Sequence, residues 1–373
     1  MSKKTTDRKG SSNQQITPSP YALLSSYRGE LMGIATLAVM YLHTMIIGLS
    51  AEKQPFRFMQ RSSHIGVEIF ILLSGFGLYH SLQKNTIKDY FLKRMARLMP
   101  AWASFLLIHL IVDKLVFGLS FSLKEIIGFL TFQGFRAGLG NQGNWYVYTI
   151  FLYYLIAPVP YSFLKESKHK FTTFLLLFSA VYLASYSYFG NRDLLITFIR
   201  LPIFILGMYL AAAADSGADK ITKSVTQPMG KAGLLACALL TLLFGAAHYF
   251  VLLRCSDDVL WDYGLWWHGL LFLVTPLCLL LCRLFSLIDF RQNGEHKKNP
   301  LTGPLRIIGS ASLEIFLIHL YIFKYWGEIT GILLRKSVSF RIGIFFLSIL
   351  LGILWHLLLT LIISLFRKKT PTA

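Results

Sequence analysis

Two ionisable residues, His43 and Glu68, stand inside apolar stretches where a charge is costly. His43 closes the stretch LMGIATLAVMYLH, and Glu68 lies near the start of GVEIFILLSGFGLYHSL. A charged side chain in hydrocarbon costs roughly 2.5 kcal/mol or more, so such residues are usually functional. An imidazole beside a carboxylate can act as a general base, because the carboxylate fixes its tautomer and raises its basicity. The alternative for His43 is a hydrogen bond to a neighbouring helix.

The chain that holds these residues has the composition of a polytopic membrane protein. Of its 373 residues, 54% are hydrophobic and 15% are charged, and the mean hydropathy is +0.55. A soluble globular domain carries more charge than this. We therefore expect an all-α bundle of about ten transmembrane helices over residues 25–366, between tails at 1–24 and 367–373. A spanning helix needs roughly 20 mainly apolar residues, and such runs lie at 31–49, 65–83, 98–118, 145–164, 172–189, 196–214, 231–253, 264–288, 305–331 and 339–366.

Lysine and arginine gather in alternate connections between these runs. The formal net charge is +19, but these residues do not form the single water-exposed surface that a nucleic-acid-binding protein needs. Cytoplasmic loops carry an excess of Lys and Arg, and the richer connections hold Arg28, Lys88, Lys168, Lys223 and Lys298. This pattern predicts a multi-pass protein of the cell membrane with both termini in the cytoplasm. The N-terminal tail has no apolar signal-peptide core, so we expect it to be a disordered cytoplasmic segment.

In this orientation His43 and Glu68 lie at similar depths near the outer face. At 1.5 Å per residue, His43 is about 9 Å and Glu68 about 5 Å from the outer ends of their helices. On sequential helices these two groups can pair, which would make them the catalytic residues. Glu30 is excluded from this role because it lies about 20 Å from His43 along the helix axis, at the cytoplasmic end.

A pair of arginines follows the second apolar run, in the segment KRMARLMP. Arg94 and Arg97 are three residues apart and therefore share a helix face, where two guanidinium groups can hold one polyanion. The alternative is ordinary positive charge on the cytoplasmic side. Arginine at both points, beside a helix that we expect Pro100 to interrupt, favours phosphate binding. Lys93, directly before Arg94, is a further candidate for the same ligand.

Five more polar residues lie at or inside the apolar runs and remain candidate site residues. Arg200, in FIRLPIFILG, either snorkels outward or lines a cavity. Glu314 and His319 lie five residues apart in SLEIFLIHLY on the ninth run. Asn144 and Trp145 open the fourth run at the outer interface, where anchoring is the usual role of Trp.

Four other patterns give weaker signals for chemistry. The segment GLGNQG matches a dinucleotide-binding spacing, but no strand precedes it and a flexible turn is favoured. Ser74, in LLSGFG, lacks the strand-to-helix elbow of a nucleophilic serine, so helix packing is the favoured role. The histidines show no paired ligand spacing, so no metal site is expected. The four cysteines lack CxxC spacing and are interpreted as small buried hydrophobic residues.

Taken in order, these segments resemble the acyltransferase 3 family of integral membrane acyltransferases. They are ELMGIATLAVMYLH, GVEIFILLSGFGLYHSL, YFLKRMARLMP, NWYVYTIFLYYLIAP, FIRLPIFILG and SLEIFLIHLYIF, and the resemblance covers roughly residues 25–365. It implies that His43 is the catalytic histidine and that Glu68 fills a typical acidic position. It also implies that Arg94 and Arg97 are the pair linked to acyl-CoA.

The resemblance implies an enzyme that moves an acyl group, expected to be acetyl, from acyl-CoA to a hydroxyl. The acceptor would be a cell-surface glycan, such as an exopolysaccharide, or a lipid-linked sugar. The chain departs from the family where many members carry a basic residue eleven positions before the histidine: Met32 stands there, and Arg28 lies four residues earlier. The alternative function is a transporter or flippase for an acylated or acidic metabolite, using the same buried residues as a relay. The sequence shows neither the inverted repeat nor the paired broken helices expected of one.

Overall fold

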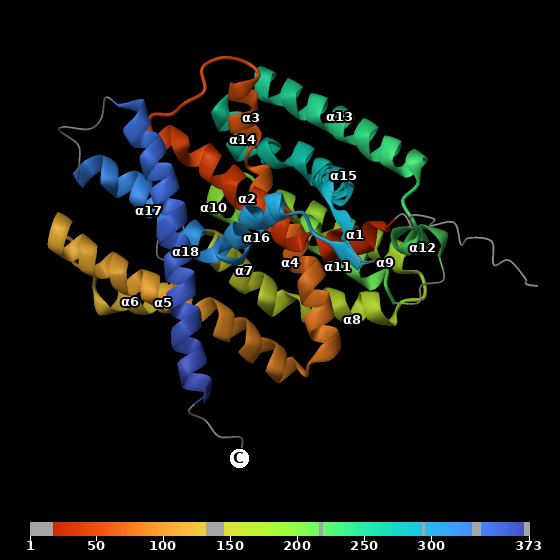
Figure 1. The fold of residues 1–373 in the computed structure, drawn as a ribbon, viewed down its shortest axis with the longest axis horizontal. Coiled ribbons are helices and arrows are strands. Elements are labelled where there is room, and N and C mark those ends of the chain that lie inside the picture. Colours follow the sequence, from red (N-terminus) through yellow and green to blue (C-terminus); the bar gives the residue numbers. More distant parts are fainter. Residues whose placement is uncertain (1–17, 132–144, 216–218, 293–294, 330–336, 369–373) are drawn as a thin grey trace, which may run out of the picture.

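The computed structural model describes residues 18–131, 145–215, 219–292, 295–329 and 337–368, and nearly all regular structure within them is helical (Figure 1). The longer helices are α2 (Arg28–His43), α4 (Ile65–Lys84), α5 (Ile87–Phe117), α7 (Trp145–Ile156), α9 (Lys170–Ser185), α11 (Leu201–Ala212), α13 (Lys231–Arg254), α15 (Leu265–Ile288), α17 (Ser312–Ile329) and α18 (Val338–Lys368). The shorter helices are α1 (Pro20–Ser26), α3 (Phe56–Ser62), α6 (Leu123–Leu130), α8 (Pro158–Glu166), α10 (Arg192–Phe198), α12 (Lys220–Thr226), α14 (Asp257–Asp262) and α16 (Gly303–Ser310). Strands β1 (Phe290–Gln292) and β2 (Glu295–Lys297) form an antiparallel hairpin between α15 and α16.

The number of potential membrane spans agrees with the hydropathy pattern. Within the described residues, eight helical segments are long and apolar enough to cross a membrane, and two bent helix pairs bring the number to ten. The α7–α8 pair bends by 43° and the pair formed by residues 300–310 and α17 bends by 71°. The expectation of continuous runs at 145–164 and 305–331, without broken helices, was therefore wrong. At the first bend Pro158 occupies the first turn of α8, where its missing N–H ends the preceding helix.

Helices α4 and α11 form the centre of the bundle, and glycines let their backbones meet. A Cβ added at Gly75 would lie 2.1 Å from the carbonyl oxygen of Phe204, and one added at Gly207 would lie 2.1 Å from that of Leu72. Only glycine fits at either point, as at close helix contacts in membranes. This contact supports the packing role expected for the segment around Ser74.

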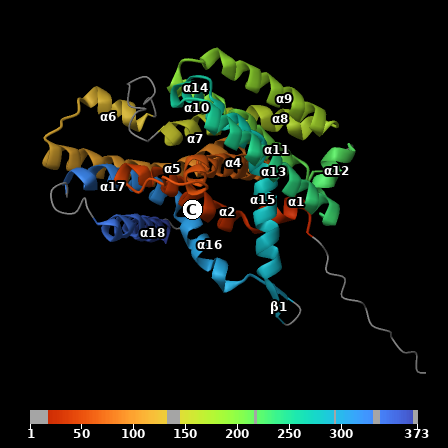
Figure 2. The same ribbon diagram turned by 90° about the horizontal axis from the view of Figure 1, so that it is seen from above.

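The helices at the edge of the bundle expose apolar side chains. In the most apolar windows of α9, α13 and α18, only 11%, 6% and 17% of residues are buried, against 83% in the segment that contains α11. Figure 1 shows α13 along the upper edge of the bundle, and Figure 2 shows α18 at its lower left edge. In water such faces would be strongly unfavourable, so they fit contact with lipid.

Two local expectations differ from the structure. Helix α5 runs through Pro100 without a break, because a helix in apolar surroundings tolerates one missing backbone hydrogen bond when its neighbours support it. Helix α1 begins at Pro20, within the segment expected to be a disordered tail. The Ser19 hydroxyl caps it by accepting from the Ala22 N–H at 3.2 Å, and Leu23 and Leu24 are buried in the core.

Candidate active site

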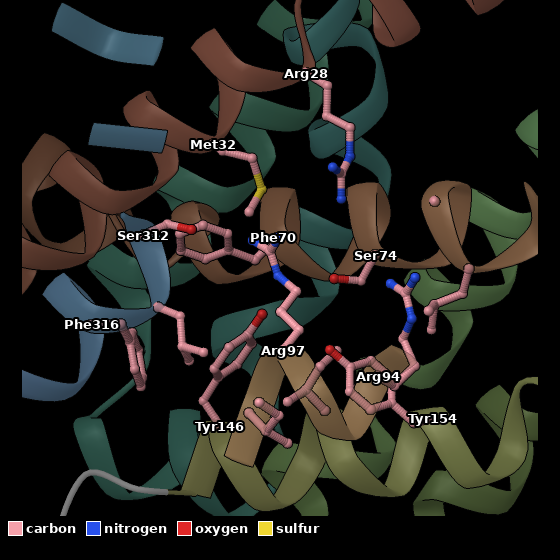
Figure 3. A pocket seen from close by; sticks show the side chains of 15 residues that line it. Arg28, Met32, Phe70, Ser74, Arg94, Arg97, Tyr146, Tyr154, Ser312 and Phe316 are labelled. Carbon is pink, nitrogen blue, oxygen red and sulfur yellow. The ribbon is translucent and has the colours of Figure 1, made fainter. Parts of the chain in front are cut away.

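Three arginines from two helices line one cavity, which we call the arginine cavity. Arg28 lies at the start of α2, and Arg94 and Arg97 lie on α5. Figure 3 shows all three side chains directed into the cavity, with Ser74 of α4 between them. The cavity has a volume of about 80 Å³. Its remaining lining residues are Met32, Phe70, Gly77, Leu78, Leu98, Tyr146, Ile150, Tyr154, Ser312, Leu313 and Phe316.

The arginine cavity is suited to an anion. None of the described residues that line it is a carboxylate, and none of its arginines forms an ion pair within the described part of the chain. Arg94 donates to the Ser81 hydroxyl at 3.1 Å, while its buried Nε has no protein partner among the described residues. Converging guanidinium groups without a counter-charge are a typical phosphate or carboxylate site.

Arg28 lies beside Met32 in the wall of the arginine cavity. The two residues are one helical turn apart on α2 and therefore share a face, and both line the arginine cavity. A Cβ added at Gly77 would lie 3.3 Å from a terminal nitrogen of Arg28, so glycine leaves room for the guanidinium. Arg28 therefore adds a third guanidinium to the cavity, from the helix face that carries Met32.

Lys93 lies apart from this cavity. Its side chain is exposed and its ammonium donates to the side-chain carbonyl of Asn85. Ser74 does line the cavity, but the described lining holds neither a histidine nor a carboxylate that could activate its hydroxyl. A nucleophilic role for Ser74 therefore has no geometric support here.

A second and larger cavity, of about 910 Å³, contains His43 at the opposite end of α2. We call it the histidine cavity. Arg28 and His43 are separated by roughly 22 Å along the helix axis at 1.5 Å per residue. The principal polar and aromatic lining residues are His43, Glu52, Arg57, Gln60, Arg61, His64, Phe105, His109, Trp145, Asp257, Trp261, Trp266, Phe316 and Tyr321.

His43 is paired with His319 of α17, whereas the sequence suggested Glu68. The His43 Nδ1 and His319 Nε2 atoms lie 3.1 Å apart, and His319 is fully buried. The expected His43–Glu68 pairing is therefore wrong. Similar depth places two groups at one level of the membrane, but rotation about each helix axis decides which neighbour a side chain meets.

The hydrogen bonds around this pair define the tautomer of each ring. His319 Nδ1 lies 3.1 Å from the carbonyl oxygen of Ile315, which can only accept, so this nitrogen carries the proton. In a neutral His319 the Nε2 atom must then accept, and His43 Nδ1 donates to it. The remaining nitrogen of His43, Nε2, is left with a free lone pair, as a general base requires.

Glu68 forms a buried ion pair with Arg200 instead. The Arg200 Nε donates to a Glu68 carboxylate oxygen at 2.7 Å, and both residues are fully buried. The guanidinium also lies 4.8 Å from the ring of Trp145 and 4.6 Å from that of Trp267, and it donates to the Ile196 carbonyl at 2.8 Å. Arg200 was expected either to snorkel outward or to line a cavity. It does neither, because it is fully buried and lines neither of the two cavities. It fastens α4 to the junction of α10 and α11, behind the histidine cavity.

The other candidate residues lie in different settings. Trp145 lines the histidine cavity and stacks on Arg200, so it is more than an interfacial anchor. A carboxylate oxygen of Glu314 lies 3.0 Å from Nδ1 of His356 on α18, and Glu314 lines neither cavity. Asn144 and the GLGNQG segment lie outside the described residues. No group of three or more His, Cys, Asp or Glu side chains in the described ranges could hold a metal ion.

Comparison with known proteins decides the family. Residues 31–365, nearly the whole chain, match the family model described as an acyltransferase domain. The chain belongs to the acyltransferase 3 family. No curated protein and no solved structure matches this acyltransferase. The six-segment resemblance in the sequence is confirmed.

Several residues of the histidine cavity of this acyltransferase were not identified from the sequence. His64 lies against Trp266, with ring centroids 4.9 Å apart, and Arg61 stacks on the same indole at 4.9 Å. Gln60 donates to the Thr44 hydroxyl at 2.8 Å and so secures the loop after His43. None of these residues belongs to a motif with a fixed spacing. In the arginine cavity, Arg28 was noted in the sequence but not named as a site residue, although its spacing of four residues from Met32 keeps the same helix face.

Proposed function

We propose that this acyltransferase moves an acyl group, acetyl in the simplest case, from acyl-CoA to a hydroxyl of a cell-surface glycan or lipid-linked sugar. One observation carries the proposal: a cationic cavity and an imidazole-bearing cavity lie at opposite ends of α2 and share one wall residue, Phe316. This arrangement suits a donor and an acceptor that approach from opposite faces of the membrane.

In this proposal the arginine cavity holds the phosphates of the donor. Arg28, Arg94 and Arg97 offer planar forks that match phosphate oxygens. A cavity of about 80 Å³ is far below the roughly 300–1,000 Å³ of a site for a whole drug-sized ligand. It therefore receives only part of the donor, and the remainder of CoA stays outside the bundle.

The histidine cavity has the size and lining for a sugar. Its volume falls within the usual range for ligand sites. Trp261 lines the cavity beside Trp266, whose indole is packed against His64 and Arg61, and Arg61 and Asp257 form an ion pair at 2.6 Å. Aromatic rings with a few polar groups can hold a molecule that is apolar on its ring faces and polar at its edge.

Transfer then follows general-base chemistry at His43. The acceptor hydroxyl gives its proton to Nε2, and its oxygen forms a bond to the thioester carbonyl carbon. The carbon–sulfur bond breaks, and the CoA thiolate takes the proton from the imidazolium. The ester and free CoA leave, and His43 returns to its neutral state.

The donor site predicts a change in the Michaelis constant. Replacing Arg28, Arg94 or Arg97 with Gln should raise KM for acetyl-CoA by roughly ten- to a hundredfold, because each loses charge-assisted hydrogen bonds worth about 1.5–3 kcal/mol, with a smaller change in kcat. Steady-state CoA release by purified protein measures both constants. Lys93→Gln is the matched control, since Lys93 neighbours Arg94 but lies outside the cavity. An unchanged KM in all three arginine variants would remove the donor assignment.

The proposed reaction is tested by its product. Surface glycans from cells with the active protein should carry an acyl mass that is absent from cells with the His43→Ala variant, as read by mass spectrometry. Purified protein should release CoA in step with acylation of those glycans. Movement of a metabolite across vesicles without CoA release would instead indicate a transporter.

Orientation gives a separate prediction. Positive charge predicts that Lys88 and Lys168 face the cytoplasm and that Asp258 faces outward. All three side chains are exposed, so cysteines there, in a chain with its four native cysteines replaced, report access directly. In intact cells a membrane-impermeant thiol reagent should label position 258 and leave positions 88 and 168 unlabelled. Labelling of position 88 would show that the protein has the opposite orientation, with the arginine cavity on the outer side of the membrane.

A further inference from the structure

We infer that Phe316 is the partition between donor and acceptor, and that it makes the enzyme select a sugar hydroxyl over water. The inference rests on the proposed function and adds a specificity-determining residue to it. Among the described residues, Phe316 is the only one that lines both the arginine cavity and the histidine cavity. Its side chain is 5% exposed, so it fills the space between the two cavities.

The packing around Phe316 holds its ring between the two reacting sites. On one side its centroid lies 4.9 Å from that of Tyr146, which lines the arginine cavity. Figure 3 shows these two rings next to each other at one end of that cavity. On the other side the ring lies 5.7 Å from His319, edge to face, and His319 holds the catalytic histidine. A row of side chains in contact, formed by Tyr146, Phe316, His319 and His43, thus leads from one cavity to the other.

This placement has a chemical consequence. A thioester whose phosphates sit in the arginine cavity and which extends toward His43 meets the ring of Phe316, the described residue that lines both cavities. The ring keeps water in the larger cavity from the thioester until a sugar fills that cavity, and only then does the thioester pass the ring to His43. If water reached it, His43 could take a proton from that water just as from a sugar, and the products would be free CoA and a carboxylic acid. Excluding water from a reactive group is a recognised role of a closed site.

The test removes the ring and follows hydrolysis. Phe316→Ala should raise CoA release from acetyl-CoA without any acceptor by about tenfold or more, still below the roughly 10²–10⁴-fold that a positioned general base contributes. Phe323→Ala is the matched control. Phe323 is also buried on α17 and packs edge to face on His319, with centroids 5.6 Å apart, but it lines neither cavity. It should cause the same loss of packing without added hydrolysis.

A second substitution separates hydrolysis at the site from damage to the fold. Adding His43→Ala to Phe316→Ala should abolish the extra CoA release, because the same imidazole activates the water. If thermal unfolding in detergent shows that Phe316→Ala does not fold, Phe316→Leu keeps an apolar side chain and should show a smaller increase. Folded Phe316 variants that release CoA no faster than Phe323→Ala would overturn the inference. The proposed function would still stand if the unchanged protein acylates glycans, and it fails only if that transfer is absent.

Discussion

His43→Ala is expected to cut acyl transfer by about 10²–10⁴-fold, the usual contribution of a positioned general base. The ring nitrogen that faces away from His319 is the base in the proposed reaction, and His319 is the side chain that holds the other ring nitrogen of His43. The variant should still insert and fold, because removing a polar group from an apolar helix does not penalise it. The rates of CoA release and glycan acylation measure the loss of acyl transfer. A melting curve in detergent shows whether the variant is folded. Near-normal transfer by this variant would make the histidine structural and the proposed mechanism wrong.

The partner of His43 adds a more selective test of the same idea. His319→Leu removes the acceptor for the His43 Nδ1 proton and should lower kcat strongly, since the base then loses its preferred tautomer. His319→Gln keeps a side-chain oxygen that can accept this proton and should recover part of the activity. The KM for acetyl-CoA should stay unchanged in both, because His319 lies outside the arginine cavity. A change in KM alone would mean that His319 only shapes the bundle.

Breaking the Glu68–Arg200 ion pair should destabilise the fold by about 3–5 kcal/mol, because one charge is left buried without a partner. Arg200→Met leaves the Glu68 carboxylate in this state. Arg200→Lys keeps a positive charge but loses the planar stacking between Trp145 and Trp267, so it should be intermediate. Glu68→Gln combined with Arg200→Met should recover part of the loss, because no charge remains. Thermal unfolding in detergent measures all three.

The matched control for this experiment is Arg192→Gln. Arg192 pairs with Asp258 and Asp262 at 3.0 and 2.8 Å, but its side chain is 47% exposed. Exposed pairs contribute about 0–1 kcal/mol, so this variant should unfold close to the unchanged protein. If Arg200→Met also behaves in this way, the buried pair does not hold α4 against α10 and α11.

Hydropathy and charge in the sequence determined most of the helical architecture. Runs of apolar residues are enough to place about ten spans, because a helix that crosses lipid must satisfy its backbone internally and cover itself with apolar side chains. The order of six motifs identified the family, and the rarity of charges in these runs singled out His43, Glu68 and Arg200. Arg94 and Arg97 share a helix face by their spacing alone.

Only the tertiary structure decided which of these residues meet. His43 bonds to His319, 276 positions away, and Glu68 bonds to Arg200, 132 positions away. The bend at Ala311 was also hidden, since an apolar run reads the same whether it is straight or broken there, whereas Pro158 marks the first bend in the sequence. Sequence position gives a residue's depth along a helix, but the partner of its side chain depends on how each helix is rotated and packed. That rotation is determined by many contacts at once, such as the glycines that bring α4 against α11.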